Sequence, residues 1–363
     1  MRLAIAGCGI IGDFHAGVAD SLEALEVVAL IDPVASQRER LAAKHGIDPS
    51  LGFDSLADAL AATQIDAVAV CTPSGYHADV AVEALEAGCH VVVEKPIDVN
   101  IEAAGRIAKA AERADRVVTV ISQHRFDPGN VALHNAVTSG RLGHITSGTA
   151  SVPWWRSQKY YDSGEWRGTW ELDGGGAVMN QGVHTVDLLV WFLGEPVEVF
   201  AWTGTLAHER IEVEDVLTAV VKFDNGALAT IHATTAANPG AGVRIGVHGD
   251  GGTAALENDE LVWFVSAADS QDGDRPGNTA DAEVAPITDE AIAGSAVAGW
   301  AASDPTALGS AHALQYLDFL DAVATGRAPK VGIADATRAL RLIRGMYASA
   351  QSGGPVTLVD VTI

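Results

Sequence analysis

The sequence predicts an α/β protein with an N-terminal doubly wound parallel sheet and a C-terminal α+β domain built on a large, mainly antiparallel sheet. The first observation is length, because 363 residues exceed one ordinary core and suit two domains of ~100–200 residues. In the first third, short apolar strands alternate with amphipathic helix patterns, which is typical of a parallel sheet covered on both faces. Longer strands of alternating polarity follow, which is typical of an antiparallel sheet.

Composition excludes several classes of protein. The chain carries 47 acidic and 23 basic side chains, a formal charge of −24, and would be repelled by nucleic acid and anionic lipid. Its 48% apolar content argues against disorder, and no apolar run approaches the ~18–20 residues that span a bilayer. The N-terminus lacks a signal-peptide cleavage pattern, and the three cysteines show no paired spacing. We therefore expect a cytoplasmic protein that binds neither nucleic acid nor membranes.

The first domain is expected to cover residues 1–122. Its predicted strands are residues 3–6, 27–31, 51–53, 65–71, 90–94 and 117–121, with 51–53 the weakest. Its predicted helices are residues 15–25, 34–45, 55–62, 77–87 and 102–114. Gly88 stands where a helix C-cap is expected, and Pro33 and Pro96 follow strand ends, which marks the boundaries.

The second domain is expected to cover residues 123–363. A helix at 129–139 precedes strands at 144–152, 197–207, 213–223, 227–235, 243–249 and 253–257. Asp224, Asn225 and Gly226 indicate a hairpin, because a primed turn needs residues that tolerate positive φ. Residues 266–310 lose periodicity and predict an irregular segment with short helical pieces. Helices at 312–325 and 333–351 and a strand at 356–361 close the chain.

Gly7, Gly9 and Gly12 form G-x-G-x-x-G between the first strand and the first helix. The first glycine permits a tight turn, the second lets the backbone approach a pyrophosphate, and the third lets the helix pack on the sheet. Asp32 ends the second strand, where a carboxylate can bind the ribose hydroxyls of adenosine but repels a 2′-phosphate. Only Arg38 stands nearby to compensate, so NAD is favoured over NADP. The expected contacts of this Rossmann-type motif are Gly7, Gly9, Ile10, Ile11, Gly12 and Asp32.

Four further segments combine into a recognisable pattern: CTPSGYH at 71–77, EKP at 94–96, QHRF at 123–126 and GGGAVMNQGVHTVDLLVWFLG at 174–194. Together they resemble the Gfo/Idh/MocA family of sugar and polyol oxidoreductases, over nearly the whole chain. The resemblance implies an NAD-dependent enzyme that forms a homodimer or homotetramer through the outer face of its second sheet. It also implies a set of strand-end residues at the cofactor cleft, namely Thr72, Pro73, His77, Glu94, Lys95 and Gln123.

In that family the lysine of E-K-P and the histidine of the glycine-rich helix are the usual catalytic pair, here Lys95 and His184. The chemistry fits, because an ammonium at the carboxyl end of a buried strand can stabilise a developing oxyanion. A histidine titrates near neutrality and can take up the hydroxyl proton. Many members carry aspartate where this chain has Asn180, which removes a candidate proton acceptor. We assign Asn180 to the catalytic group as a residue that orients the substrate or the imidazole.

Asn180, His184, Asp187 and Trp191 follow one another at i, i+4, i+7 and i+11, which predicts a polar row on one face of a helix. For Asp187, a substrate contact and a supporting role behind the site remain equally open. Trp191 is expected in the core.

His15 and His77 each stand near the start of a helix beside the cofactor cleft, where cofactor contact or helix capping would serve equally. The histidines, cysteines and acidic residues show no spacing typical of metal ligands. Because the transfer of a hydride to nicotinamide needs no metal, we expect none.

Residues 154–170 hold a dense aromatic and cationic run: Trp154, Trp155, Arg156, Tyr160, Tyr161, Trp166, Arg167 and Trp170. Aromatic faces stack on sugar C–H surfaces and arginine binds anions, so the run predicts a substrate wall in which Arg156 or Arg167 contacts an anionic group. A packed loop or a subunit contact is the alternative. The expected substrate contacts are Lys95, Arg125, Trp155, Arg156, Tyr161, Arg167, Asn180, His184 and Asp187.

The sequence thus favours an NAD-dependent dehydrogenase acting on a secondary alcohol of a sugar, polyol or sugar derivative. One alternative is a glycosidase that uses bound NAD for transient oxidation and elimination. Another is a non-enzymatic, NAD-responsive regulator. The presence of both Lys95 and His184 argues against a regulator, because a sensor needs no proton acceptor.

Overall fold

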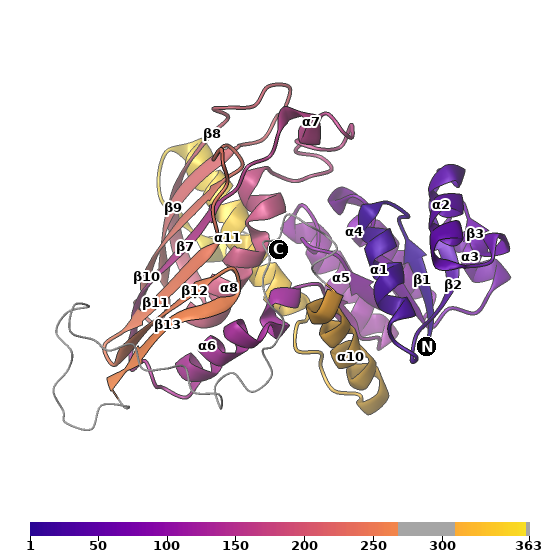
Figure 1. Ribbon diagram of the computed structural model, residues 1–363, viewed down its shortest axis with the longest axis horizontal. Coiled ribbons are helices and arrows are strands. Elements are labelled where there is room, and N and C mark those ends of the chain that lie inside the picture. The colour runs from indigo at the N-terminus through magenta and orange to yellow at the C-terminus, as the bar shows by residue number, and fades with distance from the viewer. Residues whose placement is uncertain (268–308, 361–363) are drawn as a thin grey trace.

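The computed structural model describes residues 1–267 and 309–360 and folds them around two β-sheets (Figure 1). The first sheet has six parallel strands, and the second has eight strands that are mainly antiparallel. The predicted fold class is confirmed. The irregular segment predicted at 266–310 falls mostly on residues 268–308, outside the described residues.

The first sheet has the strand order β3-β2-β1-β4-β5-β6. Its order reverses between β1 and β4, and sheets of this kind bind ligands at the carboxyl ends of the strands beside such a reversal. The strands are β1 (Arg2–Ala6), β2 (Glu26–Ile31), β3 (Gly52–Phe53), β4 (Ala67–Val70), β5 (His90–Val93) and β6 (Val118–Val120). The helices between them are α1 (Ile10–Asp20), α2 (Ala35–His45), α3 (Leu56–Ala62), α4 (His77–Glu86) and α5 (Ile101–Ala114).

The first helix differs from its predicted position. We expected residues 15–25, but α1 runs over Ile10–Asp20, with Gly9 as its N-cap. The prediction was wrong because the glycine turn is short enough for the helix to begin inside the motif, and Ser21 already ends it. Ile10, 63% exposed, and the half-buried Ile11 therefore lie in the first helical turn, next to free backbone N–H groups.

The second sheet has the order β13-β12-β11-β7-β10-β9-β8-β14. Its neighbours pair antiparallel except β7 and β10, which are parallel. The strands are β7 (Ile145–Pro153), β8 (Pro196–Gly204), β9 (Val216–Phe223), β10 (Leu228–Thr234), β11 (Arg244–Gly249), β12 (Gly252–Glu257), β13 (Glu260–Ser266) and β14 (Val356–Thr357).

Two edge strands depart from the prediction. Strand β13 was missed because Glu260–Ser266 reads as a nearly continuous apolar run rather than an alternating one. The predicted last strand at 356–361 is shorter, because after Val356–Thr357 the chain turns into a 3₁₀ helix at Leu358–Asp360. Leu358 is 1% exposed, so burial of its side chain accompanies the change of direction.

Helices cover one face of the second sheet, the face turned toward the first domain (Figure 1). They are α8 (Val183–Leu193) and α11 (Ile333–Ser352), while α6 (Pro128–Thr138) and α7 (Gln158–Tyr161) lie at its ends. Helix α10 (Gly309–Thr325) packs instead on the first sheet, where Tyr316 and Phe319 share a buried cluster with Leu3 and Ile5. Among the described residues, no helix is both long and apolar enough to cross a membrane.

Candidate active site

The glycine motif forms a cradle at the start of α1. Gly7 has φ +99°, and a Cβ there would lie 2.5 Å from the Cys71 carbonyl oxygen. A Cβ on Gly12 would overlap the Gly7 carbonyl oxygen, whereas one on Gly9 would meet no atom within 4 Å. Close packing at the first and third glycines with open space at the second is the arrangement that holds a pyrophosphate at a helix N-terminus. The motif therefore fits a dinucleotide.

Asp32 is fixed at the end of β2 by two backbone donors. Its Oδ2 accepts from Cys8 N at 2.9 Å, and its Oδ1 accepts from Val34 N at 2.9 Å. Arg38 donates to the Asp32 carbonyl oxygen, and Arg40, which the sequence analysis did not consider, donates to the Cys8 carbonyl oxygen at 2.7 Å. Two cations thus lie beside the expected ribose site, and the preference for NAD over NADP stays a prediction.

Two polar atoms of expected cofactor contacts are buried without a hydrogen-bond partner in the described part of the chain, Thr72 Oγ1 and Gln123 Oε1. They follow β4 and β6, at the carboxyl edge of the sheet, beside the half-buried Pro73. His77 bridges the same edge, with Nδ1 2.8 Å from the Pro96 carbonyl oxygen and Nε2 3.0 Å from that of Thr72. Unpaired oxygens at this edge fit a polar ligand such as NAD, while the two His77 nitrogens already contact protein.

Glu94 ends β5 in a buried network. Its Oε1 lies 2.9 Å from His15 Nε2, and its Oε2 accepts from Lys95 N at 3.0 Å. His15 Nδ1 is 2.6 Å from the Tyr316 hydroxyl, so α1, β5 and α10 meet here. Burial alone would raise the pKa of Glu94, but the hydrogen bonds from His15 and His312 hold it well below its usual value. Glu94 is therefore an ionised residue that fixes the backbone of the neighbouring lysine.

Lys95 is half-buried, and its Nζ donates to the Asn180 carbonyl oxygen at 3.1 Å. Burial lowers the pKa of Lys95, and the charges of Arg156 and Arg167 lower it further. The charges of Glu94 and Asp173 oppose this lowering. The ammonium that follows β5 of the first sheet thus reaches the glycine-rich segment before α8.

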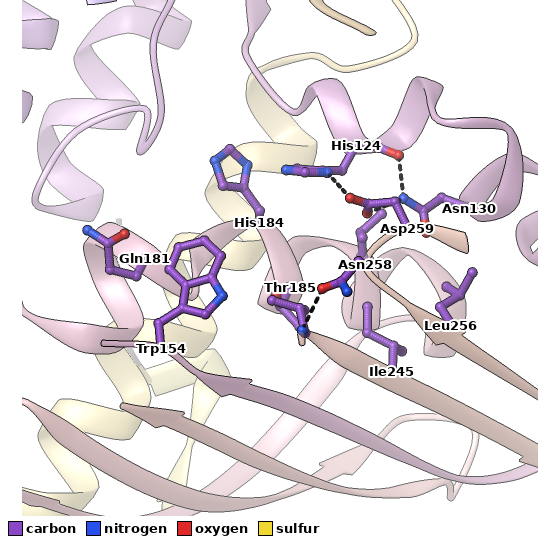
Figure 2. A pocket seen from close by; sticks show the side chains of 12 residues that line it. His124, Asn130, Trp154, Gln181, His184, Thr185, Ile245, Leu256, Asn258 and Asp259 are labelled. Carbon is purple, nitrogen blue, oxygen red and sulfur yellow. Dashed lines mark hydrogen bonds and ion pairs between the residues drawn. The ribbon is translucent and has the colours of Figure 1, made fainter. Parts of the chain in front are cut away.

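His184 faces a second histidine across the pocket of Figure 2, with its ring edge-to-face against His124 and the ring centroids 4.8 Å apart. His124 Nδ1 lies 2.9 Å from Asp259 Oδ2 and 3.2 Å from Asp127 Oδ2. Burial opposes the charge of His124, yet the two carboxylates raise its pKa to about 10. Burial, followed by the charges of His124 and Lys95, holds the pKa of His184 well below its usual value. His184 is therefore a neutral imidazole near pH 7.

The pocket around His184 joins distant parts of the chain (Figure 2). Its lining residues are His124, Asn130, Trp154, Gln181, His184, Thr185, Leu188, Val243, Ile245, Leu256, Asn258 and Asp259. Asn258 and Asp259 form the turn between β12 and β13, with φ +49° and +68°. Neither residue was predicted from the sequence. The available signal was an Asn-Asp pair after the alternating run of β12, because such residues tolerate the positive φ of a hairpin turn.

The helix expected to carry the polar row is interrupted. Residues Ala177–Gln181 form a π-helix, and α8 begins only at Val183. Buried Glu214 explains the irregular start, because its carboxylate accepts from Gly176 N and Val178 N, each at 2.9 Å. The prediction of one regular helical face is therefore wrong at Asn180, whose carbonyl in the π-turn faces Lys95.

Asn180 and Asp187, two members of this row, make side-chain contacts within the protein. Asn180 Nδ2 donates to Asp173 Oδ1 at 2.6 Å, and Asp173 is a residue that the sequence analysis missed. Asp187 accepts from Arg125 Nε at 2.8 Å and from Arg125 Nη2 at 2.7 Å, in a buried ion pair. Trp191 is half-buried and stacks on His134. The structure thus joins Arg125 and Asp187, two expected substrate contacts, to each other.

Within the aromatic and cationic run, both arginines pack against aromatic rings of the same run. The Arg156 guanidinium lies over Trp154 and Tyr160, and that of Arg167 lies over Tyr160 and Trp166. Arg156 Nη2 also donates to Gln181 Oε1 at 2.8 Å, which ties the run to the π-helix.

Two expected substrate contacts in this run lie away from the pocket lining. The Tyr161 hydroxyl is buried 2.8 Å from Thr235 Oγ1. Trp155 forms a β-bridge with Ala236, while its neighbour Trp154 lines the pocket.

Two clusters among the described residues group three possible metal ligands: His15, Glu94 and His312, and His124, Asp127 and Asp259. In each cluster a histidine nitrogen lies 2.9 Å from a carboxylate oxygen. The expectation that the protein needs no metal stays a prediction.

Comparison with known proteins agrees with this geometry. Residues 1–122 match an oxidoreductase family with an NAD-binding Rossmann fold, and residues 131–255 match the GFO/IDH/MocA C-terminal domain. D-glucoside 3-dehydrogenase of Escherichia coli is 32% identical over 66% of this chain and 71% of its own length. The 4-carboxy-2-hydroxymuconate-6-semialdehyde dehydrogenase of Sphingobium sp. is 30% identical over 72% of this chain and 81% of its own.

A solved structure is similar over nearly the whole chain. The WlbA dehydrogenase of Bordetella pertussis, in complex with NADH and UDP-GlcNAcA, is 31% identical with a TM-score of 0.84. The match covers 98% of this chain and 97% of that one. The chain therefore belongs to the Gfo/Idh/MocA family of NAD-binding oxidoreductases, and the resemblance found in the sequence is confirmed.

Proposed function

We propose that the protein is an NAD-dependent dehydrogenase that oxidises a secondary alcohol of a sugar, polyol or sugar derivative, with Lys95 and His184 as its catalytic pair. The observation that carries the proposal is the contact of Lys95 Nζ with the Asn180 carbonyl, 3.1 Å away and one turn before His184. The ammonium at the end of the parallel sheet also lies close enough to the imidazole of α8 for its charge to lower the pKa of His184. The dehydrogenases named above as relatives support the assignment to this reaction class.

NAD bound in the glycine cradle would supply the nicotinamide carbon that accepts the hydrogen and electron pair leaving the substrate carbon. The Lys95 ammonium donates a hydrogen bond to the substrate oxygen and stabilises its developing negative charge. The His184 imidazole accepts the hydroxyl proton, because its low pKa keeps it neutral near pH 7. Asn180 fixes the position of both groups through its backbone carbonyl and its place before α8.

We further propose a substrate that carries an anionic group. Arg156 and Arg167 lie near enough to Lys95 for their charges to lower its pKa, which marks a cationic region in a chain of net charge −24. The relative solved with UDP-GlcNAcA supports this substrate class. Arginine is suited to it, because its planar guanidinium can bind a carboxylate through two hydrogen bonds.

Assembly through the uncovered face of the second sheet is also proposed. Three adjacent strands of that sheet carry exposed apolar side chains, Trp202 on β8, Val220 on β9 and Leu228 on β10, each more than half exposed. A flat apolar surface of this kind is typical of a contact between subunits. Sedimentation velocity of the wild type and of Trp202→Glu with Leu228→Glu tests it, and a wild-type monomer would overturn it.

The activity is tested by reduced-nicotinamide absorbance with NAD and a panel of sugars, polyols and sugar acids. Lys95→Ala and His184→Ala should lower turnover by more than about a hundredfold while NAD still binds. Lys109→Ala, at an exposed lysine on α5, is the matched control and should behave as wild type. Glycoside cleavage without net NADH would favour the glycosidase. NAD binding without turnover on any substrate would favour the regulator.

A further inference from the structure

We infer that Asp173 is a positioning residue of the active site, which orients the side chain of Asn180 beside Lys95. The inference rests on the proposed function of Lys95 and deepens it. Asp173 is 2% exposed and stands directly before the three glycines that lead into the π-helix. It belongs to neither the glycine motif nor the polar row.

Both carboxylate oxygens of Asp173 accept hydrogen bonds from the protein. Oδ2 accepts from Gly168 N at 2.8 Å, and Oδ1 accepts from Asn180 Nδ2 at 2.6 Å. An ionised carboxylate only accepts hydrogen bonds, so the amide nitrogen of Asn180 must face it. The orientation of Asn180 is thereby fixed, and its Oδ1 has no donor among the described residues. Asn180 thus keeps one side-chain acceptor for a hydroxyl group in the cleft.

Asp173 also balances charge around Lys95. The charge of Asp173 raises the pKa of Lys95, whereas those of Arg156 and Arg167 lower it. The other carboxylate that raises it, Glu94, is already bound by His15. Asp173 therefore acts together with Glu94 to limit the lowering of the Lys95 pKa, which favours the ammonium form that donates hydrogen bonds.

The protonation of Asp173 falls near physiological pH. Burial raises its pKa to about 6, while the hydrogen bonds from Gly168 and Asn180 and the charges of Arg167 and Lys95 restrain the rise. The charge of Asp173 also raises the pKa of Tyr161, after burial as the main cause. A protonated Asp173 would have a donor of its own and would no longer require the amide nitrogen of Asn180 to face it. Activity should therefore fall as the pH drops through about 6.

A purely structural role is the competing explanation, because the bond to Gly168 N also shapes the loop. Exchange of the two side chains separates the explanations. Asp173→Asn places an amide at both positions, and Asn180→Asp places a carboxylate at both. The double variant again pairs one amide with one carboxylate, with the two exchanged between positions 173 and 180. A loop-forming role predicts no recovery, because in the double variant the residue that accepts from Gly168 N is still an uncharged amide.

The experiment compares kcat, KM and pH profiles of the full-length wild type, both single variants and the double variant, with NAD and the identified substrate. Each single variant should lose roughly tenfold to a hundredfold in kcat, the effect of one charged hydrogen bond. The double variant should recover most of that loss, with NAD binding unchanged throughout. Wild-type kcat and pH profile in Asp173→Asn, or a double variant no better than the weaker single variant, would overturn the inference.

A second measurement needs no substrate. Competitive acylation of Lys95 as a function of pH, read by mass spectrometry, reports the pKa of its amine directly. Asp173→Asn should lower that pKa relative to wild type, and Lys159, exposed on α7, serves as the internal control. An unchanged Lys95 pKa contradicts the role of Asp173, even where the wild type oxidises sugars. A wild type inactive on every substrate, with the expected Lys95 shift, contradicts the proposed reaction alone.

Discussion

The rings of His124 and His184 meet edge-to-face with centroids 4.8 Å apart, yet their environments drive their pKa values in opposite directions. Two carboxylates surround His124 and keep it an imidazolium. His184 is kept neutral by burial and by the neighbouring charges of His124 and Lys95. Pairs of titratable groups whose environments separate their pKa values are a common basis for assigning acid and base roles.

The first prediction concerns the pH dependence of oxidation. In His124→Gln a positive charge beside His184 is lost, so the pKa of His184 should rise. The acidic limb of kcat/KM should shift to higher pH by the same amount. His144→Gln, which removes an exposed histidine, is the matched control and should leave the profile unchanged. A profile of His124→Gln that superimposes on wild type would show that the two rings are not electrostatically coupled.

The second prediction concerns stability against pH. Folding raises the pKa of His124 from 6.5 to about 10, so its contribution is complete below pH 6.5 and is lost as the pH rises through 10. The free energy of unfolding, from denaturant titrations, should therefore decline between these values by a few kcal/mol. In Asp259→Asn the decline should be smaller, whereas Glu83→Gln, an exposed carboxylate on α4, should retain it. If the free energy of unfolding declined equally with pH in all three proteins, the ion pair between His124 and Asp259 would be contradicted.

The third prediction separates the glycines of the cradle. Gly9→Ala should fold with wild-type stability, because a Cβ there meets no atom within 4 Å, but it should bind NAD more weakly by at least about tenfold. Gly12→Ala should instead lower the melting temperature, because its Cβ overlaps the Gly7 carbonyl. Thermal unfolding and calorimetric titration with NAD measure both effects. Wild-type affinity in Gly9→Ala would exclude this glycine as the place where the backbone approaches the pyrophosphate.

The sequence allowed prediction of the features whose chemistry lies in local order. Gly7, Gly9 and Gly12 stand between a strand and a helix, so spacing alone predicted their role. Lys95 directly follows an apolar strand, but its role was predicted from the family resemblance. Asp259 could not be found this way, because it reaches His124 from a hairpin turn 135 residues away. Asp173 belongs to no periodic pattern. The π-helix was missed because buried Glu214, whose burial no pattern indicates, holds its first turn.

The fourth prediction decides between the two roles left open for Asp187. Its bidentate contact with Arg125 is buried on both sides, and breaking such a pair strands a buried charge. Asp187→Asn should therefore lower the free energy of unfolding by roughly 3 kcal/mol, with little change in KM of the folded enzyme. Asp335→Asn is the matched control, because Asp335 contacts the same arginine at 3.2 Å from a more exposed position. This variant should lower the free energy of unfolding by less than Asp187→Asn does. A stable Asp187→Asn with a raised KM would make Asp187 a substrate contact instead.

The fifth prediction distinguishes the two arginines of the aromatic run. Arg156 Nη2 already donates to Gln181 Oε1, and only its buried Nε has no partner among the described residues. Arg167 makes no side-chain hydrogen bond or ion pair among those residues and lies over Tyr160 and Trp166, so it has more donors available to an anionic substrate. Arg167→Gln should raise KM for a sugar acid by roughly tenfold or more, but leave KM for the matching neutral sugar unchanged. Arg156→Gln should change KM for both substrates alike, because it removes the contact with Gln181 in the π-helix. A selective effect at Arg156 instead of Arg167 would reverse the assignment, and no selectivity at either would contradict an anionic substrate.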